Sequence, residues 1–497
     1  MPLAPDLQAL RRVELHICST EDEDNMFDTF DQAKRYIQEH EIAMIDLKFA
    51  DLVGRWHHLT LTASAFTEAL MAQGIGFDGS SVGFKNVKAG DMVLVPDLST
   101  GAPDPFWDMP TLSFICATLE ADTKAVFAHD PRNIAARAEA YLRETGIADE
   151  SRWGPEFEFY VFDNVAYEND VNRAGYRLDS NEADWHSAEG SHGHYIPLHG
   201  GYHAIPPKDQ LYNLRAEMTL HLEAIGVSVK YHHHEVGGPG QVEIETPMMG
   251  LLAAGDAAML VKYVTKMTAH AHGQTVTFMP KPLYGEAGNG LHFHQHLFKE
   301  SQPLFYDPTG YANLSQTALH YVGGLLKHGP AVLAFTSPST NSYRRLVPGF
   351  EAPVNLFFSV GNRSAAIRVP KYADQPETKR IEFRPPDATC NVYLALAAML
   401  LAGLDGIVRE IDPTAEGYGP IDENVFAWPE EKRQQIKSLP RTLEEALHAL
   451  DMDRDFLTVG GVFTVDLIDA WIEHKLHEFN AVQTRPHPYE VELYFDL

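Results

Sequence analysis

Cysteine is scarce in this chain, and its scarcity excludes several kinds of site. The 497 residues contain three cysteines, Cys18, Cys116 and Cys390, and their spacing matches no metal-binding or redox motif. Disulfide frameworks and zinc ribbons need closely spaced cysteines, so neither is expected here. The N-terminal residues also lack the apolar core of a signal peptide. We therefore expect a reduced, cytoplasmic protein.

The chain also has few long apolar runs and few positively charged residues. The longest apolar run, Val392 to Leu404, is too short to cross a bilayer comfortably and predicts a buried helix. The 39 lysines and arginines face 69 aspartates and glutamates, which leaves a formal net charge of −30. Such a surface repels nucleic acid and anionic lipid, so we expect no nucleic-acid partner and no membrane association. It suits a soluble enzyme in which carboxylates bind metal ions.

The order of predicted elements indicates an α+β protein with a small N-terminal unit and a large C-terminal one. The glycine-rich stretch GFDGSSVGF at 76–84 matches neither a dinucleotide-binding loop nor a Walker loop. In the small unit we expect a helix at 26–42, paired strands within 43–61, and strands at 91–100 and 111–120. In the large unit, helices at 132–145, 255–272, 314–330 and 390–410 alternate with antiparallel strands, unlike a regular βαβ array.

A strand-like stretch, GPEFEFYVFD at 154–163, holds two glutamates on one face. Alternation places Glu156 and Glu158 on one side of the strand and Phe157 and Phe159 on the other. Like charges this close raise each other's pKa, so either water solvates both carboxylates or a cation lies between them. The stretch alone leaves both explanations open.

A second stretch, YHHHEVGGPGQVEIE at 231–245, repeats the pattern. Its Gly-Gly-Pro-Gly turn joins two extended runs, and a five-residue loop would place Glu235 directly opposite Glu243. A solvated strand face is the ordinary explanation for any one of these glutamates, but two such pairs in one chain weaken that explanation. The three consecutive histidines are weak support for zinc, because neighbouring strand residues point to opposite faces.

Further stretches supply imidazoles, another carboxylate and arginines. GNGLHFHQH places His292, His294 and His296 on one strand face, and KRIEFRPPD places Glu382 and Arg384 on one face. Carboxylates with a single imidazole favour Mg²⁺ or Mn²⁺ over zinc. Several arginines stand near Glu351 and form either an ion-pair network or an anion site facing metal ions, namely Arg344, Arg345, Arg363 and Arg368. Metal ions beside arginines are what phosphoryl transfer needs.

The order of these motifs resembles that of bacterial glutamine synthetase of type I. The shared motifs, from about residue 28 to the end, are FDGSS, GPEFEFYVFD, GGYHAIPPKD, HHHEV, FMPKP, NSYRRLVPGFEAP, NRSAAIRVP, RIEFRPPDAT and GGVFT. The resemblance implies an N-terminal extension at 1–25, a β-grasp-like domain at 26–125 and a catalytic domain at 126–497. It implies a curved antiparallel sheet with packed helices in the catalytic domain. It also implies a dodecamer of two stacked hexameric rings, with active sites between neighbouring subunits.

The chemistry that the resemblance implies is ATP-dependent ligation of ammonia to L-glutamate through γ-glutamyl phosphate. At least two divalent ions, Mg²⁺ or Mn²⁺, are implied for each subunit. The site that orients glutamate would use Glu158, Glu235 and Glu243. The site that binds the nucleotide phosphates would use Glu156, His292 and Glu382. Such ions would offset the repulsion between the paired glutamates.

The resemblance also assigns residues to glutamate and ATP. Arg345 and Arg384 would hold the glutamate carboxylate and the transferring phosphate, because a guanidinium fork suits both oxyanions. Gly288 would offer its backbone to glutamate. The residues assigned to ATP are His294, Arg363 and Arg368.

Catalysis and ammonium binding are assigned to three more residues and to Arg363. Glu351 would close the site and take a proton from ammonium, and Arg363 would neutralise charge as the phosphoryl group moves. Asp51, from a neighbouring subunit, and Tyr202 would complete the ammonium pocket. An amine ligase of the same fold would instead take a larger amine, and an inactive homologue would not need intact ligands. A metal-dependent hydrolase would not need so many arginines.

Two positions depart from the family pattern. Ala287 stands where the family has an asparagine that contributes to glutamate binding, and Asn289 stands where serine is usual. Phe426 stands where some members carry the tyrosine that accepts AMP, and Tyr418 is a poor substitute for it. A phenyl ring has no hydroxyl, so we expect no adenylylation of this loop.

Overall fold

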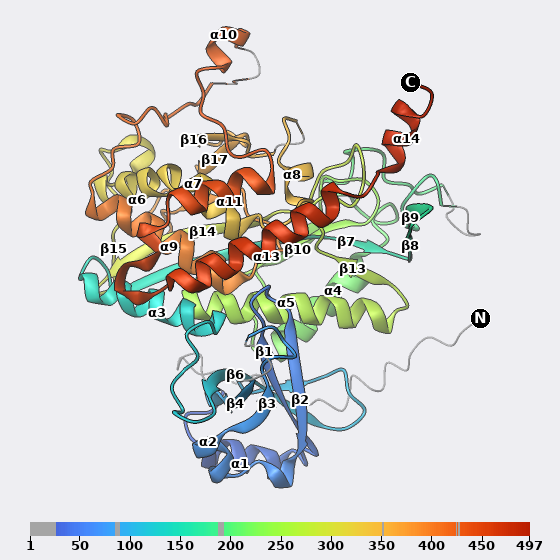
Figure 1. Cartoon of the computed structure of the whole chain (residues 1–497), viewed down its shortest axis with the longest axis vertical. Helices are drawn as coiled ribbons and strands as arrows, with labels where there is room; N and C mark the ends of the chain where they lie inside the picture. The colour runs from blue at the N-terminus through green and yellow to red at the C-terminus, as the bar shows by residue number, and fades with distance from the viewer. Residues whose placement is uncertain (1–25, 85–89, 187–192, 350–351, 424, 426–427) are drawn as a thin grey trace.

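The computed structural model describes residues 26–84, 90–186, 193–349, 352–423, 425 and 428–497, and it contains two large sheets (Figure 1). The first has six strands in the order β2-β1-β6-β4-β3, with β5 paired to β6. Its strands are β1 Met44–Ala50, β2 Trp56–Thr62, β3 Ile75–Asp78, β4 Asp91–Pro96, β5 Ala102–Asp104 and β6 Thr111–Glu120. β1 and β6 run parallel, and the other pairs run antiparallel.

Helix α1 (Phe30–Glu39) packs on this first sheet. It begins where Thr29 accepts the N–H of Gln32 and the Gln32 side chain accepts the N–H of Thr29, which satisfies two donors at the helix start. Ala33 and Ile37, one turn apart, are buried in the same apolar cluster as Phe114 of β6. The helix predicted at 26–42 and the paired strands within 43–61 are confirmed. A short helix, α2 (Glu68–Gln73), precedes β3.

The second sheet has ten strands and carries most of the predicted site residues. Its main path is β10-β11-β7-β14-β18-β17-β16, with β12 and β13 paired to β7 and β15 paired to β14. Its strands are β7 Glu150–Phe162, β10 Tyr231–His234, β11 Gln241–Glu245, β12 Met249–Gly250, β13 Thr275–Thr277, β14 Leu291–Lys299, β15 Gln302–Pro303, β16 Asn355–Val360, β17 Ala365–Val369 and β18 Ile381–Phe383. All pairs except β16 with β17 are antiparallel. The predicted α+β class is confirmed.

Helix α9 (Val392–Val408) forms the centre of the helical packing. It contacts α3, α5, α6 and α7, and every residue from Val392 to Leu404 is buried, as the apolar run predicts. Burial of each valine, leucine or methionine side chain in this run contributes about 1.5–3 kcal/mol. The other helices are α3 Pro131–Thr145, α4 Tyr212–Ala224, α5 Leu251–Ala271, α6 Gln316–Lys327, α7 Gly329–Thr336, α8 Ser342–Arg345, α10 Glu430–Arg433, α11 Leu443–Met452, α12 Asp455–Thr458, α13 Val465–Gln483 and α14 Pro488–Tyr494.

The single helix predicted at 314–330 is in fact two helices. α6 ends at Lys327 and α7 begins at Gly329, with His328 between them. Pro330 lies in the first turn of α7, where no helical hydrogen bond needs its missing N–H. The chain therefore starts a new helix there and holds His328 at the junction.

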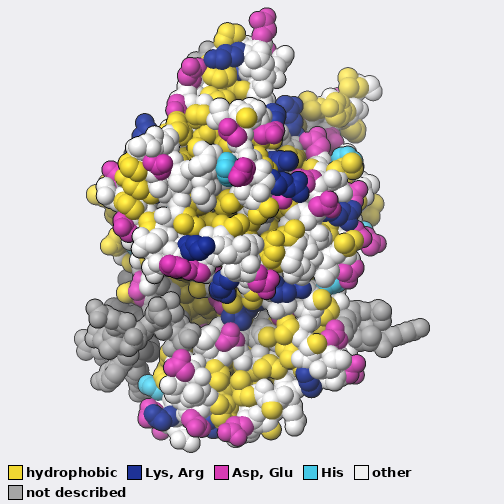
Figure 2. Space-filling model, turned by 90° about the vertical axis from the view of Figure 1, so that its left-hand side faces the viewer, with side chains coloured by type: hydrophobic (Ala, Val, Ile, Leu, Met, Phe, Trp, Pro, Cys, Tyr) yellow, Lys and Arg dark blue, Asp and Glu magenta, His cyan; other side chains and the backbone are white. Residues whose placement is uncertain are grey.

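Besides α10, which projects at the top of Figure 1, two further segments extend from the body of the molecule. One is the hairpin of β8 (Asn164–Asp170) and β9 (Arg173–Asp179), and the other is α14 near the C-terminus. Figure 2 shows acidic and basic side chains spread among hydrophobic ones over one face of both lobes. Among the described helices, none is long and apolar enough to cross a membrane.

Candidate active site

A cavity of about 220 Å³ lies at the central strands of the second sheet. All predicted metal ligands line it, namely Glu156, Glu158, Glu235, Glu243, His292 and Glu382. The predicted substrate and nucleotide residues that also line it are Gly288, Arg345, Arg384, Tyr202, Arg363 and Arg368. Asp51 and His294 are not among the described lining residues, and Glu351 lies outside the described part of the chain.

The register of β7 with its two neighbours brings the glutamates together. On one side, Glu158 of β7 lies opposite Glu243 of β11. On the other side, Glu156 lies opposite His292 of β14. Phe157, between the two glutamates, is fully buried in the hydrophobic core. The predicted alternation of this strand is confirmed.

Glu156, His292 and Glu382 form one candidate metal group, with ligand atoms within 4.8 Å of one another. Nδ1 of His292 lies 3.1 Å from Oε2 of Glu156 and 3.7 Å from Oε1 of Glu382. Two carboxylates and one imidazole suit Mg²⁺ or Mn²⁺. The structure thus brings together the trio that the resemblance assigned to the nucleotide-side ion.

A second candidate group consists of His233, Glu235 and Glu243. The resemblance assigned Glu158 to this site, but the third member of the group is His233. Oε2 of Glu158 instead accepts the N–H of Gly290 at 2.6 Å. The two nitrogens of His233 lie 3.6 Å from Glu235 and 3.5 Å from Glu243. Oε2 of Glu235 is buried and accepts no hydrogen bond from any described residue. An orphaned buried carboxylate oxygen fits a divalent cation, because burial without a partner is costly.

The predicted pairing across the Gly-Gly-Pro-Gly turn is wrong by two residues. Glu243 lies opposite His233, and the N–H of Glu235 donates to the carbonyl of Gln241 at 2.9 Å. The turn has the expected five residues, 236–240, and a loop of that length pairs Glu235 with Gln241 rather than with Glu243. The Gln241 side chain accepts the N–H of Gly237 at 2.6 Å and holds this turn. A shift of two residues preserves the strand face, so Glu235 still lines the cavity.

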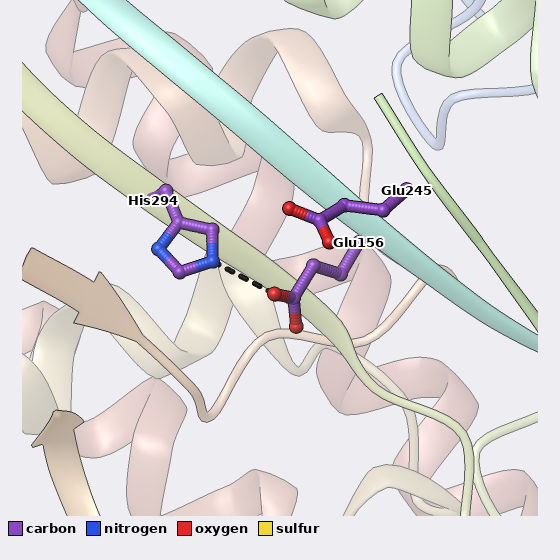
Figure 3. Close-up of side chains that lie close together, drawn as sticks. All are labelled: Glu156, Glu245 and His294. Carbon is purple, nitrogen blue, oxygen red and sulfur yellow. Dashed lines mark hydrogen bonds and ion pairs between the residues drawn. The ribbon is translucent and has the colours of Figure 1, made fainter. Parts of the chain in front are cut away.

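A third group, which the sequence argument missed, shares Glu156 (Figure 3). Glu156, Glu245 and His294 bring ligand atoms within 4.8 Å, and Figure 3 shows the Glu245 carboxylate facing the other two side chains. Nε2 of His294 lies 2.7 Å from Oε1 of Glu156, and Oε1 of Glu245 lies 2.5 Å from Nζ of Lys230. The signal was available, because Glu245 follows Glu243 at the strand period of two.

Burial and neighbouring charges separate the pKa values of the cavity carboxylates. Burial, together with Glu158 and Glu243, raises the pKa of Glu235 well above its usual range. Burial and the neighbouring carboxylates likewise raise the pKa of Glu243. Burial alone would also raise the pKa of Glu156, but the imidazoles beside it, above all that of His294, hold this pKa well below its usual range. Negative charge is therefore poorly compensated at Glu235 and Glu243.

Arginines form another part of the cavity wall. Nε of Arg368 pairs with Oε2 of Glu382, and Nε of Arg384 lies 3.0 Å from Oε1 of the same carboxylate. The guanidinium of Arg345 donates to the backbone carbonyl of Pro385 at 2.8 Å and to that of Arg384 at 3.1 Å. These bonds fix the planes of the guanidinium groups. A fixed planar fork is suited to binding carboxylate and phosphate oxygens.

Comparison with known proteins matches both sheets to one enzyme family. Residues 41–121 match the family model described as "Glutamine synthetase, beta-Grasp domain", and residues 128–494 match "Glutamine synthetase, catalytic domain". The chain belongs to the glutamine synthetase family. The family's activity is the ATP-dependent formation of glutamine from glutamate and ammonia, and it implies a divalent metal.

Bacterial members of the family are similar along nearly the whole chain. A glutamine synthetase from Frankia alni is 48% identical, over 95% of this chain and 100% of the relative. One from Streptomyces filamentosus is 46% identical, with the same coverage. The cryo-EM structure of Plasmodium falciparum glutamine synthetase has a TM-score of 0.84 and 27% identity, over 94% of this chain and 99% of that one. The predicted resemblance to the bacterial type and the β-grasp fold are confirmed.

Asp51, which the resemblance assigned to the ammonium pocket, lies at the end of β1, away from the cavity lining of its own chain. Oδ1 accepts the N–H of Arg55 at 2.8 Å, and Oδ2 lies 3.0 Å from Nε2 of His57. The side chain of Asn391 donates to the Asp51 carbonyl at 3.1 Å. Asp51 is thus held rigidly at the contact between the two lobes.

Of the two departures from the family pattern, the one at Ala287 and Asn289 lies within the described residues. Ala287 is buried on the cavity wall, and its carbonyl accepts the hydroxyl of Tyr160 at 2.8 Å. The side chain of Asn289 is fully buried, donates to the carbonyl of Met279 at 2.9 Å and accepts from Gln241 at 3.0 Å. Asn289 therefore does not replace the missing amide at position 287.

The AMP-accepting position, Phe426, lies outside the described residues. Tyr418, the substitute considered for it, is only 6% exposed, and Nζ of Lys437 lies 4.1 Å from its ring centroid. A buried side chain is a poor acceptor for a transferase, so the absence of adenylylation in this loop remains our expectation.

Proposed function

We propose that this enzyme forms glutamine through γ-glutamyl phosphate, at a site that binds two divalent cations, Mg²⁺ or Mn²⁺. The observation that carries the proposal is the meeting of five carboxylates and four arginines in one cavity. Neither hydrolysis nor simple amino-acid binding requires both sets. Transfer of a phosphoryl group between ATP and a carboxylate requires both, because charge builds on the phosphate oxygens.

The first step is attack by the γ-carboxylate oxygen of glutamate on the terminal phosphorus of ATP, with ADP leaving. Arg363 and Arg368 bind the nucleotide phosphates, and Arg345 and Arg384 hold glutamate and the moving phosphoryl group. Glu382 orients two of these guanidinium groups through its ion pairs with Arg368 and Arg384. His294 supports Glu156 from the nucleotide side of the site. The product is an acyl phosphate and ADP.

The second step joins ammonia to the acyl carbon and releases phosphate. Asp51 of a neighbouring subunit and Tyr202 bind ammonium, and Glu351 accepts the proton that ammonium loses. Gly288 offers its backbone to glutamate. Exclusion of water by Glu351 protects the acyl phosphate, which would otherwise hydrolyse.

Divalent ions held by these carboxylates would neutralise charge on the phosphates and orient glutamate. His292 and Glu382 with Glu156 form the nucleotide-side set. Glu235 and Glu243 form the glutamate-side set, with Glu158 or His233 as the third donor. Both sets consist of oxygen donors with at most one imidazole, which suits Mg²⁺ and Mn²⁺.

The assembly proposed for the chain is a dodecamer of two hexameric rings in the cytoplasm. Asp51 supports shared sites, because it does not line the cavity of its own chain. The proposed division is an N-terminal extension at 1–25, a β-grasp domain at 26–125 and a catalytic domain at 126–497. Light scattering of the purified protein would test the assembly.

Coupled release of ADP tests the proposed reaction. The assay omits glutamate or ammonium in turn, and it replaces ammonium with methylamine or a polyamine in parallel. We expect rapid ADP release only with glutamate and ammonium together, with glutamine formed in equal amount. Release without glutamate would indicate a hydrolase, and faster release with a larger amine would indicate an amine ligase.

A further inference from the structure

The turn that follows Glu235 is held by side chains from distant parts of the chain. The turn covers residues 236–240 and joins β10 to β11. Three of its backbone N–H groups donate to side-chain oxygens, at Gly237, Gly238 and Gly240. Only the first acceptor, Gln241, is a neighbour in sequence.

Glu182 is the first distant acceptor. It lies just after the β8–β9 hairpin and is 1% exposed. Its Oε2 accepts the N–H of Gly240 at 2.8 Å and lies 3.0 Å from Nε2 of His234. Its Oε1 accepts the N–H of Gln210 at 2.8 Å. One carboxylate therefore binds both sides of the turn.

Glu286 is the second distant acceptor, and it is also 1% exposed. Its Oε2 accepts the N–H of Gly238 at 2.8 Å. A Cβ atom at position 238 would lie 2.3 Å from Oε1 of Glu286, so only glycine allows this approach. Gly240 has a φ of +92°, a conformation that side chains rarely adopt.

These contacts converge on the backbone of Glu235. The ring nitrogen Nδ1 of His234 lies 2.9 Å from the carbonyl oxygen of Glu235, while its Nε2 faces Glu182. The N–H of Glu235 donates to Gln241 at 2.9 Å. The backbone of Glu235 is thus held at both its N–H and its carbonyl, while its side chain lines the cavity.

We propose that Glu182 and Glu286 are positioning residues that hold Glu235 in the geometry needed for cation binding. The proposal rests on the proposed function, because it takes Glu235 as a metal ligand. Partners one shell away from a metal orient its ligands, and their substitution typically weakens metal binding about 10- to 100-fold. A glutamine at position 182 offers one acceptor oxygen where three donors converge.

Titration of the full-length enzyme with Mn²⁺, followed by electron paramagnetic resonance, tests the proposal. The parent should show two classes of site, and Glu235→Gln should lose one of them. We expect Glu182→Gln and Glu286→Gln to weaken that same class about 10- to 100-fold and to leave the other unchanged. We also expect the spectrum of Mn²⁺ bound at the weakened class to broaden, and excess Mn²⁺ to restore turnover.

Asp163→Asn is the matched control. Asp163 accepts two hydrogen bonds from Asn181, the residue before Glu182, and one from Gln274, and these described partners lie outside the turn. We expect this variant to bind Mn²⁺ as the parent does. Equal weakening of both classes in the Glu182 and Glu286 variants would indicate a general loss of structure and overturn the proposal.

The outcomes separate the two proposals. If Glu235→Gln binds Mn²⁺ like the parent, the metal assignment of Glu235 fails. If Glu235→Gln loses one class while Glu182→Gln and Glu286→Gln bind like the parent, the positioning role fails. If Glu182→Gln does not fold, Glu286→Gln decides the question alone, because it contacts the turn independently.

Discussion

His328, at the junction of α6 and α7, and Glu235 and Glu243, in the cavity, are all buried ionisable groups, but their surroundings differ. Nδ1 of His328 lies 2.7 Å from Asp453 and its Nε2 lies 2.8 Å from Asp405. Burial alone would lower the pKa of His328, but the hydrogen bonds to these carboxylates outweigh it and raise the pKa. Around Glu235 and Glu243, by contrast, burial and like charges act together and raise both pKa values.

The difference separates a structural cluster from a binding cluster. At the junction of α6 and α7, the chain supplies both signs of charge, so the cluster stabilises the fold by itself. At Glu235 and Glu243, the carboxylates outweigh the one imidazole beside them, His233, and a bound cation would relieve their repulsion. A perturbed pKa alone does not distinguish the two cases, whereas the sign of the neighbouring charges does.

The largest expected effect is a loss of activity when a carboxylate of the cavity is replaced and the His328 cluster is left intact. Glu156→Gln removes a carboxylate from the nucleotide-side set. We expect kcat to fall about 10²-fold or more, because a metal ion contributes several kcal/mol to the transition state. Steady-state kinetics and Mn²⁺ titration would measure this, and Glu158→Gln should weaken a different class of Mn²⁺ site.

Asp405→Asn is the matched change in the structural cluster. We expect it to lower the free energy of unfolding by about 1.5–3 kcal/mol, the usual range for a hydrogen bond to a charged group. Its kcat should stay near that of the parent. A comparable loss of kcat in both variants would mean that the His328 cluster is not merely structural, contrary to our expectation.

The next effect concerns stability with and without metal. Glu243→Gln removes one of the repelling carboxylates, so we expect a higher melting temperature than the parent in EDTA. In Mn²⁺ the order should reverse, because the parent gains about 2.7 kcal/mol when the ion is at 100 times its Kd. Thermal unfolding under both conditions would measure the reversal. A variant that is less stable than the parent in EDTA would show that neighbouring groups already compensate the negative charge of Glu243.

Local patterns predicted the fold class and the strand that carries Glu156 and Glu158. The alternation of GPEFEFYVFD needs only neighbouring residues, and so does the buried run from Val392 to Leu404. Short-range signals therefore sufficed for these elements and for their buried faces. The same alternation places Glu245 on the strand face of Glu243.

Long-range contacts decided what the sequence could not predict. The loop length of five residues is enough to pair Glu235 with Gln241, but the contacts that hold this turn come from Glu182 and Glu286, which are distant in sequence. Pro330 marks the helix break at His328 locally, but the carboxylates that contact His328 come from α9 and from the end of α11. Such features follow from tertiary packing, which overrides local preference.

A smaller effect is expected from pH at the structural cluster. The folded pKa of His328 is raised, so its contribution to stability is complete below the unfolded value of about 6.5 and is lost as pH rises through the folded pKa. Each pKa unit of such a shift corresponds to about 1.4 kcal/mol. Urea unfolding of the parent and of His328→Gln between pH 6 and 9 would measure the difference. We expect the parent's advantage to shrink as pH rises, and a growing advantage would reverse the assigned sign.

The smallest effect is expected within the cavity, at Ala287. This side chain lies on the cavity wall and cannot hydrogen-bond, and Asn289 is engaged with Met279 and Gln241. An amide at position 287 should therefore add one contact to glutamate, worth about 0.5–1.5 kcal/mol. We expect Ala287→Asn to lower the KM for glutamate roughly 2- to 10-fold and to leave the KM for ATP unchanged.

Two outcomes of Ala287→Asn would lead to different conclusions about the cavity wall. An unchanged KM for glutamate would mean that the amide does not reach the substrate. A large rise would mean that the wall is packed too tightly for a larger side chain, because Ala287 is only 4% exposed and its carbonyl is already held by Tyr160. In that case the loop that carries Gly288 is built around alanine, and binding of glutamate relies on the arginines and the metal-binding carboxylates rather than on a side-chain amide.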